Sequence, residues 1–148
     1  MNLRPATHAD AAAMARIHAD AFPAPWSADD IRRFAAQPGG FALIAEGGGD
    51  VAGFILCRVM AGEAEILTLA VRPDLRRRGA AQALVEAASA LCAQTAEAMF
   101  LEVAEDNPGA LALYARSGFR TVGRRAGYYA RAGAASVDAI VMRRALNS

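Results

Sequence analysis

A run of three arginines followed by small residues precedes a helix-forming segment. The run is Arg76-Arg77-Arg78-Gly79-Ala80-Ala81, and it follows a strand-like segment that Pro73 ends. Successive backbone N–H groups at a helix start point to one place, and the helix dipole makes that place positive. Gly79 and Ala81 would let a ligand approach the backbone closely. The pattern indicates a cradle for a pyrophosphate group; the alternative is a solvated basic turn that caps a helix.

One carboxylate and one phenol lie on regular elements that could direct them to a common site. Glu102 lies in a strand-like segment between Leu101 and Val103, and the two-residue period of a strand turns it away from both neighbours. Tyr114 lies in the helix-forming segment that Asn107 begins. Residue types of this kind can accept and donate protons during catalysis.

Composition excludes several classes of function. All 16 basic residues of the chain are arginine, and the formal net charge is +1. Without lysine, neither a Walker phosphate loop nor Schiff-base catalysis is possible. The small net charge argues against a general nucleic-acid-binding surface. His8 and His18 lie away from both cysteines in the sequence, so no metal-ligand spacing is present.

Length and cysteine content indicate the class of protein. The 148 residues suit one domain, residues 1–148. Cys57 and Cys92 are too few for a disulfide scaffold and are expected to be core thiols in a reducing compartment. No signal peptide is read at the N-terminus, and no apolar run reaches the roughly 18–20 residues that span a bilayer. We therefore expect a cytoplasmic protein that does not act at a membrane.

The hydrophobic pattern predicts the element order β-α-α-β-β-β-α-β-α-β-β. Thr7, Ser27 and Asn107 are side chains that can cap a helix, and Gly118 can end the last helix. The expected strands cover residues 2–6, 41–46, 51–60, 63–71, 99–104, 119–124 and 137–144. The expected helices cover residues 8–21, 28–36, 80–95 and 108–117.

These motifs together resemble the GCN5-related N-acetyltransferase (GNAT) superfamily. Its cofactor loop, Arg/Gln-x-x-Gly-x-Gly/Ala, matches residues 76–81, and its Leu-Tyr-x-x-x-Gly-Phe signature matches residues 113–119. Within the superfamily, the chain resembles the RimI-like ribosomal-protein-alanine N-acetyltransferases. That similarity is carried by residues 22–27, 101–110, 125–129 and 138–142, with departures from the usual pattern at Ala81, Ala130 and Val137.

The resemblance implies an α/β (α+β) fold with a mixed, mostly antiparallel central sheet of about seven strands flanked by about four helices. It implies transfer of the acetyl group of acetyl-CoA, without a metal, to the N-terminal α-amine of a protein by direct attack in a ternary complex. The acceptor would be a small ribosomal protein. The alternatives are transfer to lysine or to a small-molecule amine, and a non-catalytic module that binds acetyl-CoA.

The resemblance also suggests roles for the carboxylate and the phenol. An α-amine has a pKa near 8 and needs less help than lysine to become a neutral nucleophile, so Glu102 would suffice as the general base. A phenol can protonate the leaving thiolate, which makes Tyr114 the candidate general acid. The alternatives are a strand carboxylate on a solvated face and a helix tyrosine that only packs.

The remaining candidates divide between the cofactor and the acceptor. Backbone groups of Leu69, Ala70 and Val71 should pair with the pantetheine arm as an added strand would. Asn107 either caps its helix only or also contacts the cofactor. Candidate pyrophosphate-binding residues are Arg76, Arg77, Arg78, Gly79, Ala80, Ala81 and Gln82. Candidate acceptor-binding residues are Pro25, Trp26, Tyr128, Tyr129 and Asp138.

Three of these acceptor candidates have alternative interpretations. Trp26 follows a proline and could be a packing anchor. The Tyr128-Tyr129 pair is expected on a loop before the last strand, where it would form a substrate wall or a lid. Asp138 could face an incoming ammonium group or pair with an arginine.

Overall fold

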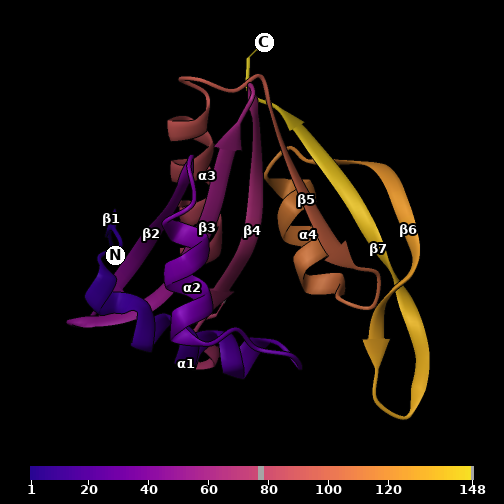
Figure 1. Cartoon of the computed structure of the whole chain (residues 1–148), viewed down its shortest axis with the longest axis horizontal. Coiled ribbons are helices and arrows are strands. Elements are labelled where there is room, and N and C mark those ends of the chain that lie inside the picture. Colours follow the sequence, from indigo (N-terminus) through magenta and orange to yellow (C-terminus); the bar gives the residue numbers. More distant parts are fainter. Residues whose placement is uncertain (77–78, 148) are drawn as a thin grey trace.

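The computed structural model describes residues 1–76 and 79–147, which form one mixed sheet with helices on both faces (Figure 1). The strand order is β1-β2-β3-β4-β5-β7-β6, with β4 and β5 parallel and the other neighbouring pairs antiparallel. The strands are β1 (Asn2–Pro5), β2 (Gly40–Gly47), β3 (Asp50–Met60), β4 (Glu63–Val71), β5 (Ala98–Ala104), β6 (Arg120–Arg131) and β7 (Ala134–Ala145). The helices are η1 (His8–Asp10), α1 (Ala11–Ala21), α2 (Ala28–Ala35), η2 (Pro73–Leu75), α3 (Ala80–Cys92) and α4 (Pro108–Arg116). The predicted fold class and element order are confirmed.

Two hydrophobic clusters lie on opposite faces of the sheet, because successive side chains of β3 point to opposite sides. Phe54 belongs to the cluster that α1 and α2 cover, whereas Ile55 belongs to the cluster that α3 and α4 cover. Cys57 and Cys92 are free and buried in the second cluster, as predicted. Each fully buried side chain of the size of Phe54 contributes about 1.5–3 kcal/mol. The sheet is therefore held rigidly from both sides.

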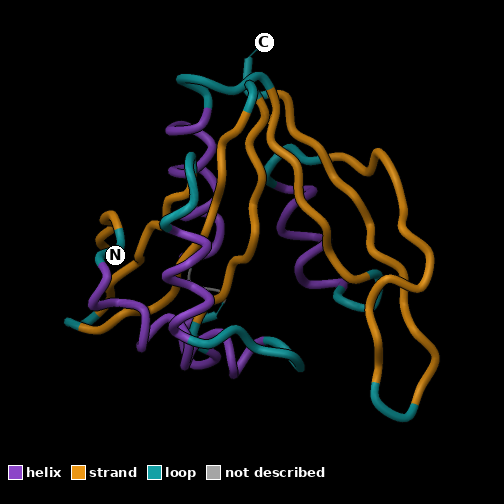
Figure 2. Tube along the Cα trace, in the orientation of Figure 1, coloured by secondary structure: helices purple, strands orange, loops and turns teal. Residues whose placement is uncertain are grey.

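β4 and β5 pair over a short stretch and then separate (Figures 1 and 2). The paired residues are Glu63–Glu65 and Ala98–Phe100. A bulge at Leu67 follows at once, since the residues on either side of Leu67 pair with consecutive residues of β3. A bulge increases the local twist of a strand, which turns β4 away from β5. Among the described residues, the edge of β4 that faces β5 has no strand partner over Leu67–Val71.

Local sequence signals explain where the helices begin. Ser27 Oγ accepts a hydrogen bond from the Asp30 N–H at 3.1 Å, and the Asp30 carboxylate accepts one from the Ser27 N–H at 3.1 Å. This reciprocal pair is a capping box, and the cap predicted at Ser27 is confirmed. Asn107 and Pro108 begin α4 in the cap and first helical positions that their types favour. None of the described helices is long and apolar enough to cross a membrane.

The C-terminal hairpin is longer than predicted, and the loop predicted for Tyr128-Tyr129 is wrong. Both tyrosines lie in β6, which pairs irregularly with β7. Residues 126–128 oppose only Asp138, and Gly127 in this bulge has a φ of +60°. Most of β6 is exposed, so the sequence lacks the alternation that reveals a half-buried strand.

Candidate active site

A groove of about 610 Å³ lies between the end of β4, the start of α3 and one side of α4. Five of its eleven lining residues are Gly or Ala. Six lining residues were predicted to bind a cofactor: Val71, Arg76, Gly79, Ala80, Ala81 and Gln82. Five others were not predicted: Leu75, Gly109, Ala112, Leu113 and Arg116.

The first turn of α3 can receive an anionic group. Gly79 precedes α3 with a φ of +81°, and a Cβ added there would meet nothing within 4 Å. Gly79, the residue before the helix, has no side chain that could cap the N–H groups of this turn, and α3 has 13 residues, so donors and dipole both face the groove. Arg77 and Arg78 were also predicted for this cradle, but they lie outside the described residues.

Leu69, Ala70 and Val71 occupy the edge of β4 that faces the gap beside β5. An extended chain placed in this gap would meet backbone groups of β4 that no described strand pairs with, although the Val71 carbonyl accepts a hydrogen bond from Arg76 Nε at 3.3 Å. Asn107 lies at the start of α4, where its Oδ1 accepts a hydrogen bond from the Ala110 N–H at 3.1 Å. Its role as a helix cap is therefore confirmed, whereas a contact between Asn107 and a cofactor stays a prediction.

Glu102 points away from the cluster that contains Leu101 and Val103, as the strand period predicts. Its side chain is 22% exposed and forms an ion pair with Arg125 of β6, with Oε1 and Nε 3.0 Å apart. The charge of Glu102 also acts on Glu65 of β4, since burial and the nearby Glu102 together raise the pKa of Glu65. Glu102 is thus a partly exposed carboxylate beside the gap between β4 and β5.

Tyr114 approaches from the other face of the sheet. Its ring is buried in the same cluster as Leu101 and packs edge-on against Phe119, with centroids 5.7 Å apart. Burial raises the pKa of Tyr114 well above its usual range, and the neighbouring Cys57 and Tyr129 add to the effect. The phenol therefore keeps its proton at neutral pH and can act as a donor.

The pKa of Tyr129 is affected by Glu102, and Tyr129 in turn affects the pKa of Tyr114. Burial raises the pKa of Tyr129, and the charge of Glu102 raises it further. Tyr129 in turn adds to the raised pKa of Tyr114. Glu102 and Tyr114 are therefore both coupled electrostatically to Tyr129.

The predicted acceptor-binding residues come from two segments of the chain. Trp26 packs against Phe34 with ring centroids 4.7 Å apart and also stacks on His18, so it is a packing anchor; Pro25 beside it is exposed. Tyr128 is 54% exposed and meets Tyr129 edge-on. In Figure 1 the loop between α1 and α2 and the tip of the β6–β7 hairpin lie at the open end of the gap between β4 and β5.

Asp138 fills the bulge of β6. Its Oδ1 accepts a hydrogen bond from the Gly127 N–H at 2.9 Å, and its Oδ2 pairs with Arg124 Nη1 at 2.5 Å. The alternative that Asp138 pairs with an arginine is therefore the one the structure supports. By holding the bulge, Asp138 fixes the part of β6 that carries Tyr128.

Two residues beside Glu102, Arg125 and Glu65, were not among the site residues predicted from the sequence. The acidic alternation of residues 63–65 could have pointed to Glu65, because alternate strand residues share a face. No local signal indicates that Arg125 reaches Glu102. That contact depends on β7 lying between β5 and β6 in the sheet.

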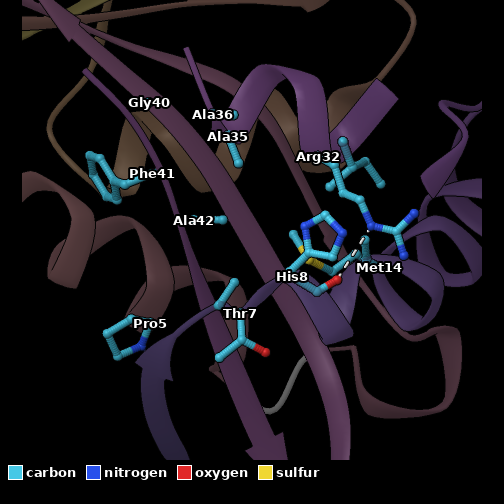
Figure 3. A pocket seen from close by; sticks show the side chains of 13 residues that line it. Pro5, Thr7, His8, Met14, Arg32, Ala35, Ala36, Gly40, Phe41 and Ala42 are labelled. Carbon is cyan, nitrogen blue, oxygen red and sulfur yellow. Dashed lines mark hydrogen bonds between the residues drawn. The ribbon is translucent and has the colours of Figure 1, made fainter. Parts of the chain in front are cut away.

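A second groove, of about 370 Å³, lies between η1, α1, α2 and the start of β2 (Figure 3). Its wall includes Thr7, Met14 and Phe41, and Arg32 Nε donates a hydrogen bond to the His8 carbonyl at 3.4 Å. None of the predicted catalytic or binding residues lines it. Of the two grooves, only the one beside α3 contains predicted cofactor-binding residues, and neither Glu102 nor Tyr114 is among the residues that line either groove.

Comparison with known proteins agrees with this geometry. Residues 11–119 match the acetyltransferase (GNAT) family. The chain belongs to this family and is an N-acetyltransferase, and the family uses acetyl-CoA as the acetyl donor.

Within this family, the chain is similar to several enzymes that are named as N-terminal or ribosomal-protein N-acetyltransferases. The chain is 35% identical over 144 residues to the N-alpha-acetyltransferase RimI of Mycobacterium tuberculosis, covering 93% of this chain and 88% of that protein. It is 34% identical over 110 residues to the ribosomal protein bS18-alanine N-acetyltransferase of Escherichia coli K12, covering 71% of each. The crystal structure of the ribosomal-protein-S18-alanine N-acetyltransferase from Escherichia coli superposes with a TM-score of 0.91 at 26% identity, covering 99% of this chain and 94% of that one.

Proposed function

We propose that the chain transfers the acetyl group of acetyl-CoA to the N-terminal α-amine of a protein. The acceptor is the N-terminal alanine of a ribosomal protein in the cytoplasm, the class of substrate named for the Escherichia coli relative. The observation that carries the proposal is the groove that joins the first turn of α3 to the edge of β4, with the Glu102 carboxylate partly exposed beside the gap between β4 and β5.

The groove fits acetyl-CoA. The uncapped first turn of α3 and the open side of Gly79 suit a pyrophosphate, which needs backbone donors and close approach. The unpaired edge of β4 suits the pantetheine arm, which carries amide groups that can pair with a strand. When bound, acetyl-CoA supplies an activated acetyl group as a thioester.

The residues beside the gap would then move two protons. Glu102 accepts a proton from the α-ammonium of the acceptor, directly or through a water molecule, so that the amine nitrogen can attack the acetyl carbon. As the C–S bond breaks, Tyr114 Oη donates its proton to the leaving sulfur. The attacking nitrogen loses its second proton to solvent as the C–S bond breaks, the phenolate is reprotonated from solvent, and the proton on Glu102 is released, so that one proton is released in net. The sum is an amide, a thiol and no net redox change.

The decisive experiment compares three acceptors in a steady-state assay. The first is a peptide that begins with Ala and has a free α-amine. The second has the same sequence with a blocked α-amine and one internal Lys, and the third is a small amine such as spermidine. The enzyme itself contains no lysine, so any acetylated side-chain amine belongs to the acceptor.

The proposal predicts transfer to the first peptide and a kcat at least about 100-fold lower for Glu102→Gln, the size expected for loss of a general base. Transfer only to lysine or only to the small amine would overturn the α-amine assignment. Binding of acetyl-CoA without transfer to any acceptor would support the non-catalytic alternative.

A further inference from the structure

His18 is a buried histidine that the proposed mechanism does not use. It lies in the last turn of α1 and is 3% exposed. Its Nδ1 accepts a hydrogen bond from the backbone N–H of Trp26 at 3.1 Å, and its Nε2 lies 3.2 Å from Thr68 Oγ1. Because a backbone N–H can only donate, Nδ1 carries no proton, and the Nε2–H donates to Thr68.

The His18 ring holds both ends of a short loop. It stacks on Phe22 with centroids 4.3 Å apart and on Trp26 with centroids 5.1 Å apart. Between these aromatic residues the chain runs through Pro23–Pro25, which is exposed. The prolines restrict the backbone, so few alternative conformations compete with the one that His18 fixes. The segment Phe22–Trp26, here called the acceptor loop, is thus anchored at each end to one ring.

Thr68 ties the same ring to the cofactor side of the site. It follows the Leu67 bulge in β4 and precedes Leu69–Val71, the edge assigned to the pantetheine arm. Thr68 is buried, and the His18 hydrogen bond fixes its hydroxyl. The His18 ring therefore contacts both the acceptor loop, through Trp26, and the strand proposed to bind the acetyl donor, through Thr68.

We infer that His18 is a positioning residue that sets the acceptor loop at a fixed distance from the acetyl donor; this inference rests on the proposed function. Both ring nitrogens are occupied, so His18 does not exchange a proton with substrate. Its effect on the rate comes through alignment of the acceptor amine. A misplacement of about 1 Å can lower a rate about 100-fold.

Variants can separate the two hydrogen bonds. The amide oxygen of H18N can replace Nδ1 as the acceptor for Trp26, and the amide of H18Q can reach toward Thr68 as Nε2 does. H18F keeps an aromatic ring for stacking but loses both bonds. Thr68→Val removes only the Thr68 partner without touching the ring, and Thr68→Ser restores a hydroxyl as the matched rescue variant.

The kinetic experiment compares the effect of each variant on kcat/KM for the acceptor peptide with its effect on the Kd of the acetyl donor. For Thr68→Val and H18F, kcat/KM for the Ala peptide should fall at least about tenfold. The Kd of acetyl-CoA, measured by titration calorimetry, should stay within about twofold. Thr68→Ser should recover most of the rate lost in Thr68→Val, whereas H18N, which keeps the acceptor for Trp26 but not the bond to Thr68, should lose at least as much rate as Thr68→Val. A loss that Thr68→Ser fails to recover, or an equal loss of acetyl-CoA binding, would contradict a positioning role and indicate a general packing defect.

A second readout needs no activity. Trp26 is the one tryptophan of the chain, so its fluorescence reports directly on the acceptor loop. Thr68→Val should make Trp26 more accessible to acrylamide quenching than in the wild-type protein, and Thr68→Ser should not. Unchanged quenching together with unchanged kcat/KM would overturn the inference. If the wild-type protein acetylates no peptide, the proposed function fails, while increased quenching in Thr68→Val still supports the anchoring of the loop.

Discussion

Glu102, the proposed general base, also forms an ion pair with Arg125. Arg125 is 58% exposed in that pair and Glu102 is 22% exposed, so water screens the attraction and the pair adds at most about 1 kcal/mol to stability. An exposed partner can move aside at little cost. Arg125 therefore orients the Glu102 carboxylate but can release it. The proposed general base needs this freedom, because it must contact the incoming ammonium group of the acceptor.

Tyr114→Phe should lower kcat about 100-fold or more, because it removes the proton donor for the leaving thiolate while leaving the ring in place. The Kd of acetyl-CoA should not change by more than about twofold. Since burial raises the pKa of Tyr114 well above its usual range, kcat of the wild-type enzyme should show no fall from Tyr114 ionisation up to pH 10. A pH profile of kcat for both proteins checks this, and an unimpaired Tyr114→Phe enzyme would contradict the assignment.

His18 should also make stability depend on pH. Burial lowers its pKa from 6.5 to about 4, so the unfolded chain binds a proton in this range that the folded chain does not. Folding is therefore most favoured above pH 6.5, and stability falls as pH decreases from 6.5 to 4. Urea midpoints measured across this range should show a shallower slope for H18F.

Asp10 provides an internal reference for that measurement. Its hydrogen bonds to Arg4 and Thr7 lower the pKa of the Asp10 carboxyl well below the usual value. The stability it contributes is present above pH 3.8 and is lost at lower pH, in a separate range. If H18F keeps the wild-type slope between pH 4 and 6.5, His18 is not the titrating group.

At the scale of elements, β7 pairs with β5 over Ala139–Ala145, and arginine ion pairs add further contacts between the β6–β7 hairpin and the rest of the molecule. Arg131 binds Asp106 through two hydrogen bonds, Nε to Oδ2 and Nη2 to Oδ1, each 2.9 Å long. Asp106 precedes Asn107, the cap of α4, so this contact joins the hairpin to the loop between β5 and α4. The Arg131–Asp106 contact thereby holds the part of β6 that carries Tyr129.

Asp106→Asn should loosen the hairpin without unfolding the protein. The pair is on the surface, so the melting temperature should hardly move, because such pairs are worth about 1 kcal/mol or less. Amide exchange in residues 126–134 should become about fivefold faster, which corresponds to about 1 kcal/mol of local opening. Asp29→Asn, which removes the Asp29–Arg32 pair on α2, is the matched control and should leave that exchange unchanged.

Gly53→Ala should disturb the cofactor edge of β4. A Cβ at residue 53 would lie 2.8 Å from the Ala70 carbonyl oxygen and 3.0 Å from a Val71 methyl carbon. Overpacking of this kind costs about 1–3 kcal/mol and would displace the end of β4, so the Kd of acetyl-CoA should rise. Gly49→Ala is the control, since its added Cβ meets nothing within 4 Å. Equal acetyl-CoA affinity in both variants would show that this edge does not hold the cofactor.

Elements with strong local signals could be predicted from the sequence, and those that depend on pairing could not. The caps at Ser27 and Asn107 placed α2 and α4 to within a residue. The exposed hairpin carries no alternation, so its length was underestimated. The bulge at Leu67 depends on register with β3, and the links from His18 to Thr68 and from Arg125 to Glu102 depend on the assembled sheet.

For the whole molecule, the sheet has two halves that meet at Glu63–Glu65 and Ala98–Phe100 and then diverge. Helices α1 and α2 cover one face beside the acceptor loop, and α3 and α4 cover the other beside the groove. This arrangement lets a donor and an acceptor approach the gap from different sides. The proposed direct transfer in a ternary complex requires such an approach from two sides.

Binding of acetyl-CoA should stabilise both halves together, because the ligand would fill the gap between β4 and β5. At a ligand concentration of 100 times Kd, the stabilisation should be about 2.7 kcal/mol. Amide exchange should slow at Leu67–Val71 and at the start of α3. Protection confined to the second groove near Arg32 would place the ligand elsewhere.

The central claim is that one gap holds the acetyl donor and an α-amine in line. Two bisubstrate analogues test it, one with coenzyme A linked through an acetyl group to the α-amine of an Ala peptide, the other with the same linkage to the side-chain amine of a lysine. The measurement is the Kd of each analogue. The α-linked compound should bind at least about 100-fold more tightly than acetyl-CoA or the lysine-linked compound. Equal affinity of the two analogues would contradict the account.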